Sequence, residues 1–377
     1  MKKIVSLILC VSVLLIACSC GNNASIYKDN WRIISYYDMF EREKNGMFTT
    51  TNDRRLDFLD FETGEAIPLC DDPTCKHTSN SNCSAYGKSN HPFMVGQKLC
   101  WFEVTELYQT SNGYQSDLLM WQSDLNGENK EQLFKDEGAS CTEADRFVLY
   151  DNRLFYFETY QPYDSEFHEQ EPSVSLKSYD FSDGTKHDYG KVVNGYSCGV
   201  WCCGVWEDKL YFSTSSAEDN RPYMERLKEY TEKNNLKDDE AFISFAKDDK
   251  YITQNWTIDI KNGTIESASK FPDLITNKYI YYLNDGVLSY EDHNNKTSTI
   301  KLNDVSAVQS LSSCCIINVK KDTYLWDEES KTVYLCPLDD ETTIFYAYGD
   351  KVILRTNGEN MSNPYSIVSL KEWAVKQ

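Results

Sequence analysis

Residues 255–268 read NWTIDIKNGTIESA, and the pattern in this stretch decides the fold. A short apolar strand ends in an aspartate, a polar turn with a glycine follows, and a second strand begins, which is typical of a β-hairpin. Six further copies follow the same plan, the last of them degenerate: residues 56–69, 118–134, 175–190, 287–300, 324–338 and 364–373. Four turns hold a glycine where a hairpin often needs positive φ: Gly64, Gly127, Gly184 and Gly263. A hairpin repeated in this way indicates a repeat fold made of strands.

A second hairpin precedes most of these copies. It consists of two short aromatic strands around an Asp, Asn or Gly turn, as at residues 147–157, 204–212, 274–283 and 345–354. Two hairpins per unit make a four-stranded antiparallel sheet, so we predict an all-β fold, a β-propeller of about seven four-stranded blades. Six or eight blades also fit the spacing, and a pair of β-sandwiches or a β-solenoid is the alternative architecture. The strand at 31–39 is expected to close the ring with the last blade, which lacks a clear fourth strand of its own.

The composition argues against several classes of protein. The net charge of −21 repels phosphate backbones, so nucleic-acid binding is not expected. Aromatic residues make up 14% of the chain, which is too many for a disordered chain and agrees with a fold rich in strands. Beyond the first residues, no run of about eighteen apolar residues occurs, so no second membrane span is expected.

The first residues, MKKIVSLILCVSVLLIACSCGNN, carry targeting information. Two lysines precede an apolar run that is short for a bilayer span, which predicts a secretory signal over residues 1–17. The run ends in LIAC at 15–18, which resembles a bacterial lipobox. The resemblance implies diacylglycerol on the Cys18 sulfur, cleavage before Cys18, and a protein anchored on the extracytoplasmic face of the cell membrane. A plain signal peptide, an uncleaved anchor and acylation at Cys20 are the alternatives.

These features divide the chain into a signal peptide (1–17), a lipidated tether (18–30) and a single propeller domain (31–377). The part from about residue 31 to 375 resembles uncharacterised β-propeller lipoproteins of Gram-positive bacteria, which are related in style to WD-repeat-like and TolB-like propellers. The shared features are the lipobox, the D-[FIL]-x-x-G turns and the segment LCDDPTCKH at 69–77. The resemblance implies a fold and supplies no catalytic residues.

The long connections are expected on one face of the disc. When the strands of each blade are labelled a to d from the centre outward, the b–c and d–a connections leave the same face. The long b–c connections are residues 102–117, 158–173 and 215–250, and the d–a connection after the first blade is residues 70–90. The longest insertion predicts a short helical segment near 220–248, because apolar residues recur there every three to four positions. We expect these helices to cap the disc, or alternatively to form a lid over the channel.

Insertions gathered on one face of a repeat array usually build its binding surface, so we predict a surface for a protein or glycan partner. Exposed aromatic side chains carry much of the energy of binding. The candidate contact residues are therefore six aromatics of the insertions: Tyr108, Tyr114, Tyr160, Tyr163, Phe167 and Tyr223. The loop 158–173 also holds four acidic residues, which suits stacking on sugars or capture of a cationic partner, although acidic loops are more often simply solvated.

Residues 69–86, LCDDPTCKHTSNSNCSAY, gather three cysteines and one histidine. Their side chains supply four soft or borderline donors: Cys70, Cys75, His77 and Cys83. A set of three thiolates and one imidazole is one of the structural sets of zinc, and with all four positions filled by protein such a zinc ion would be structural. A disulfide such as Cys70–Cys83 is the default outside the membrane, and reduced thiols are the third interpretation.

Other recurrent residues have structural interpretations. Most remaining cysteines are expected to act as small buried hydrophobes, and the pairs Cys202-Cys203 and Cys314-Cys315 should alternate between the two faces of a strand. The aspartates at strand ends are expected to form turns through side-chain-to-backbone hydrogen bonds: Asp60, Asp124, Asp180, Asp259 and Asp327.

The sequence favours a binding protein over an enzyme. It lacks a G-x-S-x-G elbow, a phosphate-cradling glycine loop and an H-E-x-x-H motif. Carboxylates are abundant, so a glycan-active hydrolase or lyase with its site at the channel mouth is the competing hypothesis. A pair of carboxylates in an open channel would favour hydrolysis, whereas a channel filled by aromatic side chains would favour binding.

Overall fold

The computed structural model describes residues 31–34, 41–42, 46–50, 55–70, 72–78, 83–86, 92–111, 113–141, 147–311, 314–356 and 365–377. The predicted signal peptide 1–17, Cys18 and the tether 18–30 lie outside the described residues, as do residues 71, 79–82 and 87–90 of the predicted insertion 70–90. No helix within the described ranges is long and apolar enough to cross a membrane.

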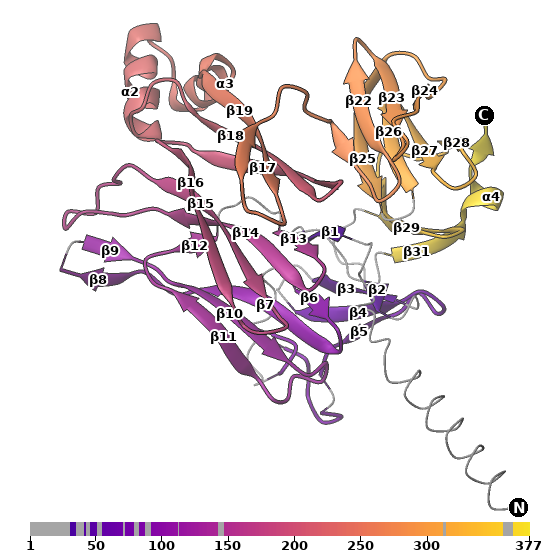
Figure 1. Ribbon diagram of the computed structural model, residues 1–377, viewed down its shortest axis with the longest axis horizontal. Helices are drawn as coiled ribbons and strands as arrows, with labels where there is room; N and C mark the ends of the chain where they lie inside the picture. The colour runs from indigo at the N-terminus through magenta and orange to yellow at the C-terminus, as the bar shows by residue number, and fades with distance from the viewer. Residues whose placement is uncertain are drawn as a thin grey trace, which may run out of the picture.

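Within the described residues the fold is a β-propeller of seven antiparallel blades, which follow one another around a ring in chain order, and one further two-stranded hairpin (Figure 1). Blade 1 contains β2 (Glu41–Arg42), β3 (Gly46–Thr50), β4 (Leu56–Asp60) and β5 (Ala66–Pro68). Blade 2 contains β6 (Phe93–Val95), β7 (Lys98–Val104), β10 (Leu118–Ser123) and β11 (Glu131–Asp136). Blade 3 contains β13 (Phe147–Tyr150), β14 (Arg153–Tyr160), β15 (Ser173–Asp180) and β16 (Lys186–Asn194), and the short β12 (Ser140–Cys141) pairs with β14.

The second half of the ring repeats this plan. Blade 4 contains β17 (Gly199–Trp206), β18 (Lys209–Ala217), β19 (Tyr251–Asp259) and β20 (Ile265–Ser267). Blade 5 contains β21 (Leu274–Ile275), β22 (Ile280–Asn284), β23 (Val287–Glu291) and β24 (Thr297–Thr299). Blade 6 contains β25 (Val305–Leu311), β26 (Cys314–Val319), β27 (Asp322–Asp327) and β28 (Thr332–Cys336). Blade 7 contains β29 (Thr342–Tyr348), β30 (Lys351–Thr356) and β31 (Tyr365–Ser369). After the short helix α4 (Leu370–Trp373), β32 (Val375–Lys376) pairs with β28 of blade 6.

The repeated hairpin has the predicted physical basis. In 255–268, the Asp259 carboxylate accepts hydrogen bonds from the backbone N–H groups of Lys261 (2.9 Å) and Asn262 (3.1 Å), and Gly263 takes a φ of 75°. Three other strand-end aspartates accept backbone hydrogen bonds in the same way: Asp60, Asp180 and Asp327. Asp124 differs, because its side chain binds those of Lys98 and Asn129. These local turns set the register of the outer strands.

Packing between neighbouring blades forms the core. Each of the seven junctions between consecutive blades contains its own cluster of buried apolar side chains. The cysteine pairs serve two junctions each, as predicted. Cys202 packs toward blade 3 and Cys203 toward blade 5, while Cys314 packs toward blade 7 and Cys315 toward blade 5.

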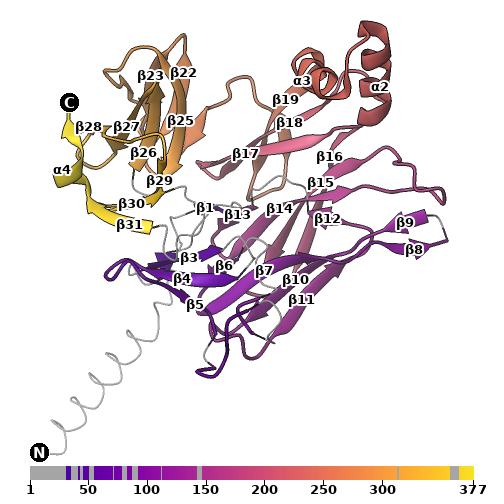
Figure 2. The same cartoon turned by 180° about the vertical axis from the view of Figure 1, so that it is seen from behind.

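The prediction that the strand at 31–39 closes the ring with the last blade is wrong. Strand β1 (Trp31–Ile34) pairs antiparallel with β13, as an additional strand inside blade 3, and both views place it near the middle of the molecule (Figures 1 and 2). Trp31 packs against the clusters of the blade 3–4 and blade 4–5 junctions. At Gly204, with a φ of 130°, an added Cβ would lie 2.2 Å from the Trp31 ring, so this glycine makes room for the indole.

The ring closes instead by side-chain packing between blades 7 and 1. Phe61 stacks on Tyr346 with ring centroids 6.0 Å apart, and Ile353 joins the same buried cluster. The Lys351 ammonium donates to the Phe61 carbonyl at 2.9 Å, which adds a polar contact across the junction. Among the described residues, blade 7 has three strands, and no strand of blade 1 pairs with them.

Because successive strands of a blade run in opposite directions, the connections between them lie on two opposite faces of the ring. We call the face with the b–c and d–a connections the loop face, and the face with the a–b and c–d turns the turn face. The predicted helical insertion lies on the loop face of blade 4 as α2 (Tyr223–Asn234) and α3 (Asp238–Asp248), which stand beyond β18 and β19 in both views (Figure 2).

Candidate functional site

Residues 70, 72–78 and 83–86 belong to a loop attached to blade 1. The Asp72 side chain accepts a hydrogen bond from the Thr74 backbone N–H at 2.8 Å, which makes the predicted turn between the first two cysteines. The other end of the loop is fixed to blade 1, because the Leu56 N–H donates to the Ala85 carbonyl at 2.9 Å and the Ser84 hydroxyl donates to the Leu69 carbonyl at 3.2 Å. Both arms of the loop are therefore held near each other.

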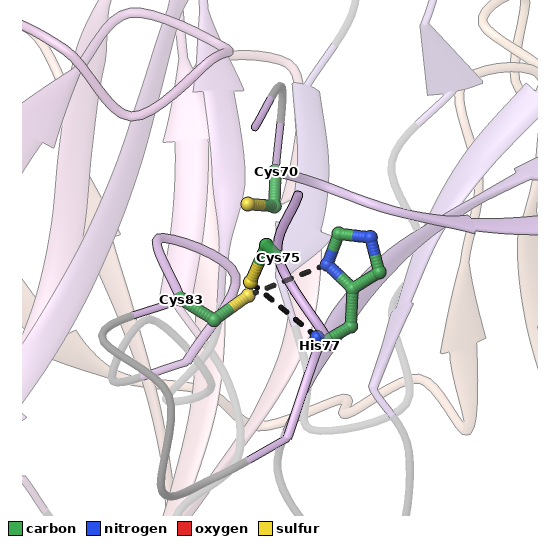
Figure 3. A group of neighbouring side chains, drawn as sticks. All are labelled: Cys70, Cys75, His77 and Cys83. Carbon is green, nitrogen blue, oxygen red and sulfur yellow. Dashed lines mark hydrogen bonds between the residues drawn. The ribbon is translucent and has the colours of Figure 1, made fainter. Parts of the chain in front are cut away.

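This loop brings all four predicted metal ligands together (Figure 3). One ligand atom from each of four side chains lies within 4.8 Å of the other three: Cys70, Cys75, His77 and Cys83. The Cys83 sulfur is 3.7 Å from His77 Nδ1, and the His77 N–H donates to the Cys75 sulfur at 3.4 Å. His77 reaches this position with a φ of 50°, which is uncommon for a side-chain-bearing residue.

The donor set and its dimensions fit a tetrahedral zinc site. Bonds of about 2.3 Å to sulfur and about 2.0 Å to nitrogen place the ligand atoms of such a site roughly 3.4–3.8 Å apart. The spacing here needs an inward shift of roughly half an ångström per ligand. Burial raises the pKa of the Cys83 thiol to about 11. At Cys70, hydrogen bonds led by the Ser84 side chain outweigh burial and lower the thiol pKa. Within the described residues no disulfide joins two cysteines.

Insertions from three consecutive blades form one hydrogen-bonded surface. The hairpin of β8 (Tyr108–Thr110) and β9 (Gly113–Gln115) extends from blade 2, and Tyr114 exchanges backbone hydrogen bonds of 3.0 and 3.3 Å with Tyr163 of blade 3. Gly113 permits this approach, because an added Cβ would lie 1.8 Å from the Tyr163 carbonyl oxygen. The blade 3 loop continues to blade 4, where the Asn220 amide donates to the Glu171 carboxylate at 2.8 Å.

The structure separates the six predicted contact aromatics into two groups. Tyr160 and Phe167 are exposed, at 44% and 53% of their surface. The other four are half-buried and hold the insertions together: Tyr108, Tyr114, Tyr163 and Tyr223. The Tyr108 hydroxyl donates to the buried Asp117 carboxylate at 2.6 Å, and Tyr223 packs against Phe245 with ring centroids 5.3 Å apart.

Phe167 lies in a hydrogen-bonded turn. The Asp164 carboxylate accepts hydrogen bonds from the backbone N–H groups of Glu166 and His168, both at 2.9 Å, and these bonds close a tight turn around Phe167. Phe167 takes a φ of 67° and stacks on Tyr163 with ring centroids 5.0 Å apart. Positive φ is costly for an aromatic residue, so the turn holds this ring outward at the expense of backbone strain.

A buried carboxylate pair between blades 2 and 3 was not found from the sequence. Asp136 ends β11 and Glu158 lies in β14, and both approach Lys177, whose ammonium is 2.5 Å from Glu158 and 3.9 Å from Asp136. Lys186 also contacts Asp136. Burial raises the pKa of Glu158 to about 7, while Asp136, which is also desolvated, has a lowered pKa because Lys186 hydrogen-bonds to it. The two residues come from different blades, so no local motif marks them.

The helical insertion is fixed by one buried arginine that the sequence reasoning also missed. The Arg226 side chain is 2% exposed and pairs with Asp249. It also donates to the Arg221 carbonyl at 3.0 Å and to the Ser197 hydroxyl at 2.9 Å. Arg226 lies three residues after Tyr223, on the apolar face of α2. A cationic residue on the apolar face of a predicted helix could have indicated a buried ion pair from the sequence.

Comparison with known proteins finds likeness in fold alone. No family model and no curated protein matches the chain. Among solved structures, an oligogalacturonate lyase in complex with manganese is 12% identical with a TM-score of 0.43, over 90% of this chain and 90% of that one. The acylaminoacyl peptidase of Pyrococcus horikoshii is 10% identical with a TM-score of 0.44, over 93% and 53%. The structure of YjhT is 10% identical with a TM-score of 0.37, over 76% and 96%. At these values the likeness carries no argument about function.

Proposed function

We propose that this protein is a cell-surface lipoprotein whose propeller binds a protein or glycan partner through its loop face. The joining of the insertions of blades 2, 3 and 4 by hydrogen bonds is the observation that carries the proposal. Blades 5 and 6 connect their b and c strands with the two-residue turns 285–286 and 320–321, so the fold does not require long connections. Long loops that bind one another on one face are the usual construction of a binding surface.

The exposed aromatic rings support the same proposal. Phe167 and Tyr160 project apolar surface into solvent although the fold offers burial to most other aromatic residues. The strained turn of Phe167 holds its ring outward before any partner arrives. A ring ordered in advance loses little conformational entropy on binding, which favours affinity.

Replacement of Phe167 by alanine tests this proposal. We expect Phe167→Ala to weaken binding at the loop face at least about tenfold, because a central aromatic contact contributes on the order of 2 kcal/mol. Binding of the full chain would be measured on a glycan array and on immobilised envelope proteins. Ile67→Ala is the matched control, since Ile67 is also exposed, at 52%, but lies in the outer strand β5 of blade 1, just after a c–d turn. Unchanged interactions in Phe167→Ala, and in a variant whose residues 161–172 are replaced by a Gly-Ser turn, would refute the proposal.

Two further assignments belong to this proposal. Acylation of Cys18 would tether the chain to the extracytoplasmic face of the cell membrane, as the lipobox resemblance implies. One structural zinc ion would be held by the cluster of the 70–83 loop: Cys70, Cys75, His77 and Cys83. Such an ion would neutralise the thiolates and order a loop that contains few apolar residues.

The second candidate function is a glycan-active hydrolase or lyase, and the Asp136–Glu158 pair is the observation that favours it. Two carboxylates with pKa values moved apart are the usual acid and base of glycoside cleavage. Against it, both carboxylates are largely buried between blades and are neutralised by lysines. Strand β1 also lies against the inner strands of blades 3 and 4, where an open channel would be needed. We therefore assign the pair a structural role.

This structural role predicts a specific pH dependence. The folded pKa of Glu158, about 7, lies above the value of about 4.3 expected in the unfolded chain. The folded state therefore favours the protonated form of Glu158. The stability that this protonation contributes is fully present below about pH 4 and is lost as the pH rises through 7. We expect the free energy of unfolding to fall by on the order of 2 kcal/mol between pH 5 and 8, and this slope to flatten in Glu158→Gln. Urea denaturation across this range measures the slope. Glu166→Gln, at an exposed carboxylate, should keep the wild-type slope, and an equally steep slope in Glu158→Gln would contradict the assignment.

A further inference from the structure

A cavity of about 330 Å³ lies where the helical insertion meets the loop-face end of blade 4. Its wall combines carboxylates with two aromatic rings and a single ammonium group: Glu218, Asp219, Tyr230, Phe245, Asp248, Asp249 and Lys250. Tyr230 and Phe245 pack together with ring centroids 5.4 Å apart and form its apolar part. A cavity of this size is at the small end of ligand sites and suits one side chain better than a large molecule.

The carboxylates of this cavity are only partly neutralised by the protein. Asp219 pairs with Arg221 at 2.6 Å, and Asp249 pairs with Arg226. Glu218 and Asp248 form no ion pair among the described residues, and Asp248 accepts a hydrogen bond of 2.5 Å from the Tyr230 hydroxyl. The second oxygen of Asp249 is buried and has no hydrogen-bond partner in the part of the chain that the structure describes, and the Asp249 side chain as a whole is 7% exposed. Buried oxygens without donors are costly, so this cavity favours a ligand that brings positive charge and N–H groups.

The surroundings reinforce the same electrostatic potential. Residues 161–172 and 217–250 carry fourteen acidic and seven basic residues, which amounts to a third of the net charge of −21 in about an eighth of the chain. The hydrogen bond between Asn220 and Glu171 places the two segments side by side. A concentrated negative potential around a cavity draws cations toward it and repels anionic ligands.

We infer that this cavity receives a lysine or arginine side chain from a basic segment of a partner protein. The inference deepens the proposed function, on which it rests, by choosing a protein partner over a glycan. The ammonium or guanidinium group would lie between Glu218 and Asp248, and its methylene groups would pack on Tyr230 and Phe245. A neutral glycan would leave these carboxylates without a cation.

A charge-matched pair of double variants tests this inference. The probe is a fluorescein-labelled hexalysine peptide, and its binding to the full chain is followed by fluorescence anisotropy at about 0.15 M salt. We expect Glu218→Gln with Asp248→Asn to weaken binding at least about tenfold. The control, Glu65→Gln with Glu329→Gln, removes the same charge from exposed residues in c–d turns of the opposite face and should weaken binding less than about twofold. Thermal denaturation of both double variants would confirm that each remains folded.

Two results would overturn the inference. Equal weakening in both double variants would show attraction by net charge alone, and no binding of hexalysine to the wild type would show that the cavity takes no cation. In either case, a neutral glycan whose binding depends on Phe167 would leave the proposed function standing. If neither hexalysine nor any array ligand responds to the variants, the proposed function fails as well.

Discussion

Cys75→Ser is expected to abolish zinc binding by the protein. The wild-type full chain, purified without oxygen or chelator, should contain one zinc ion, and the variant should contain less than about 0.1. Three ligands are too few to close a structural site, and the loop has little apolar packing to replace the metal. Elemental analysis and a thiol titration measure the two quantities directly. We also expect amide hydrogen exchange in residues 72–78 to accelerate, because metal binding and loop folding are one equilibrium.

Cys198→Ser is the control for the zinc experiment. Cys198 is also half-buried, but it lies at the blade 3–4 junction and outside the cluster, so this variant should keep its zinc. If the wild-type protein contained no zinc and two thiols fewer than its cysteine count, the loop would hold a disulfide and not a metal ion. Wild-type protein without zinc and with all thiols titrating would leave the loop reduced and the zinc assignment wrong.

Arg226→Ala is expected to release the helical insertion from blade 4. The change leaves the Asp249 carboxylate buried without its cation, which typically costs about 3–5 kcal/mol. It also removes the hydrogen bonds that hold α2 to Arg221 and Ser197. Hydrogen exchange in 223–248 should rise strongly, whereas the amides of blades 1 and 2 should keep their protection, because the helices are inserted between β18 and β19 of blade 4.

Arg221→Ala separates burial from charge in this experiment. Arg221 pairs with Asp219 and Glu229 on the surface, where its side chain is 45% exposed, so its loss should cost no more than about 1 kcal/mol. Similar hydrogen exchange in both arginine variants would mean that the buried pair does not anchor the helices. Asp249→Asn combined with Arg226→Met should recover part of the stability lost in Arg226→Ala, because neither residue then remains charged and buried.

The sequence allowed the blades to be predicted because their determinants are local. A strand-end aspartate such as Asp259 and a glycine such as Gly263 lie within five residues of each other and set one hairpin. The placement of β1 depends instead on Trp31 finding room at Gly204, 173 positions away along the chain. The spacing of the repeats and the pattern of polar and apolar residues contain no information about that contact, so the predicted partner of β1 was wrong.

The candidate site shows the same division between local and distant information. The four candidate metal ligands lie within fourteen residues, and their spacing alone suggested a cluster. The Asp136–Glu158 and Arg226–Asp249 pairs join different elements, and either residue alone is an ordinary surface type. Aromatic content identified the loops as candidates, but it could not distinguish Phe167, which is exposed, from Tyr163, on which Phe167 stacks.

The direction of β1 determines from which face of the ring the N-terminal part of the chain enters the propeller. Trp31, the first residue of β1, pairs with Tyr150 beside the a–b turn of blade 3, and the Tyr150 hydroxyl donates to Asp208 in the a–b turn of blade 4. The chain therefore enters the ring from the turn face and runs toward the loop face. If Cys18 holds the chain at the bilayer as proposed, the turn face looks back at the lipid. The 70–83 loop with its four candidate ligands, Phe167 and the acidic cavity would then face outward, toward the basic partner proposed above.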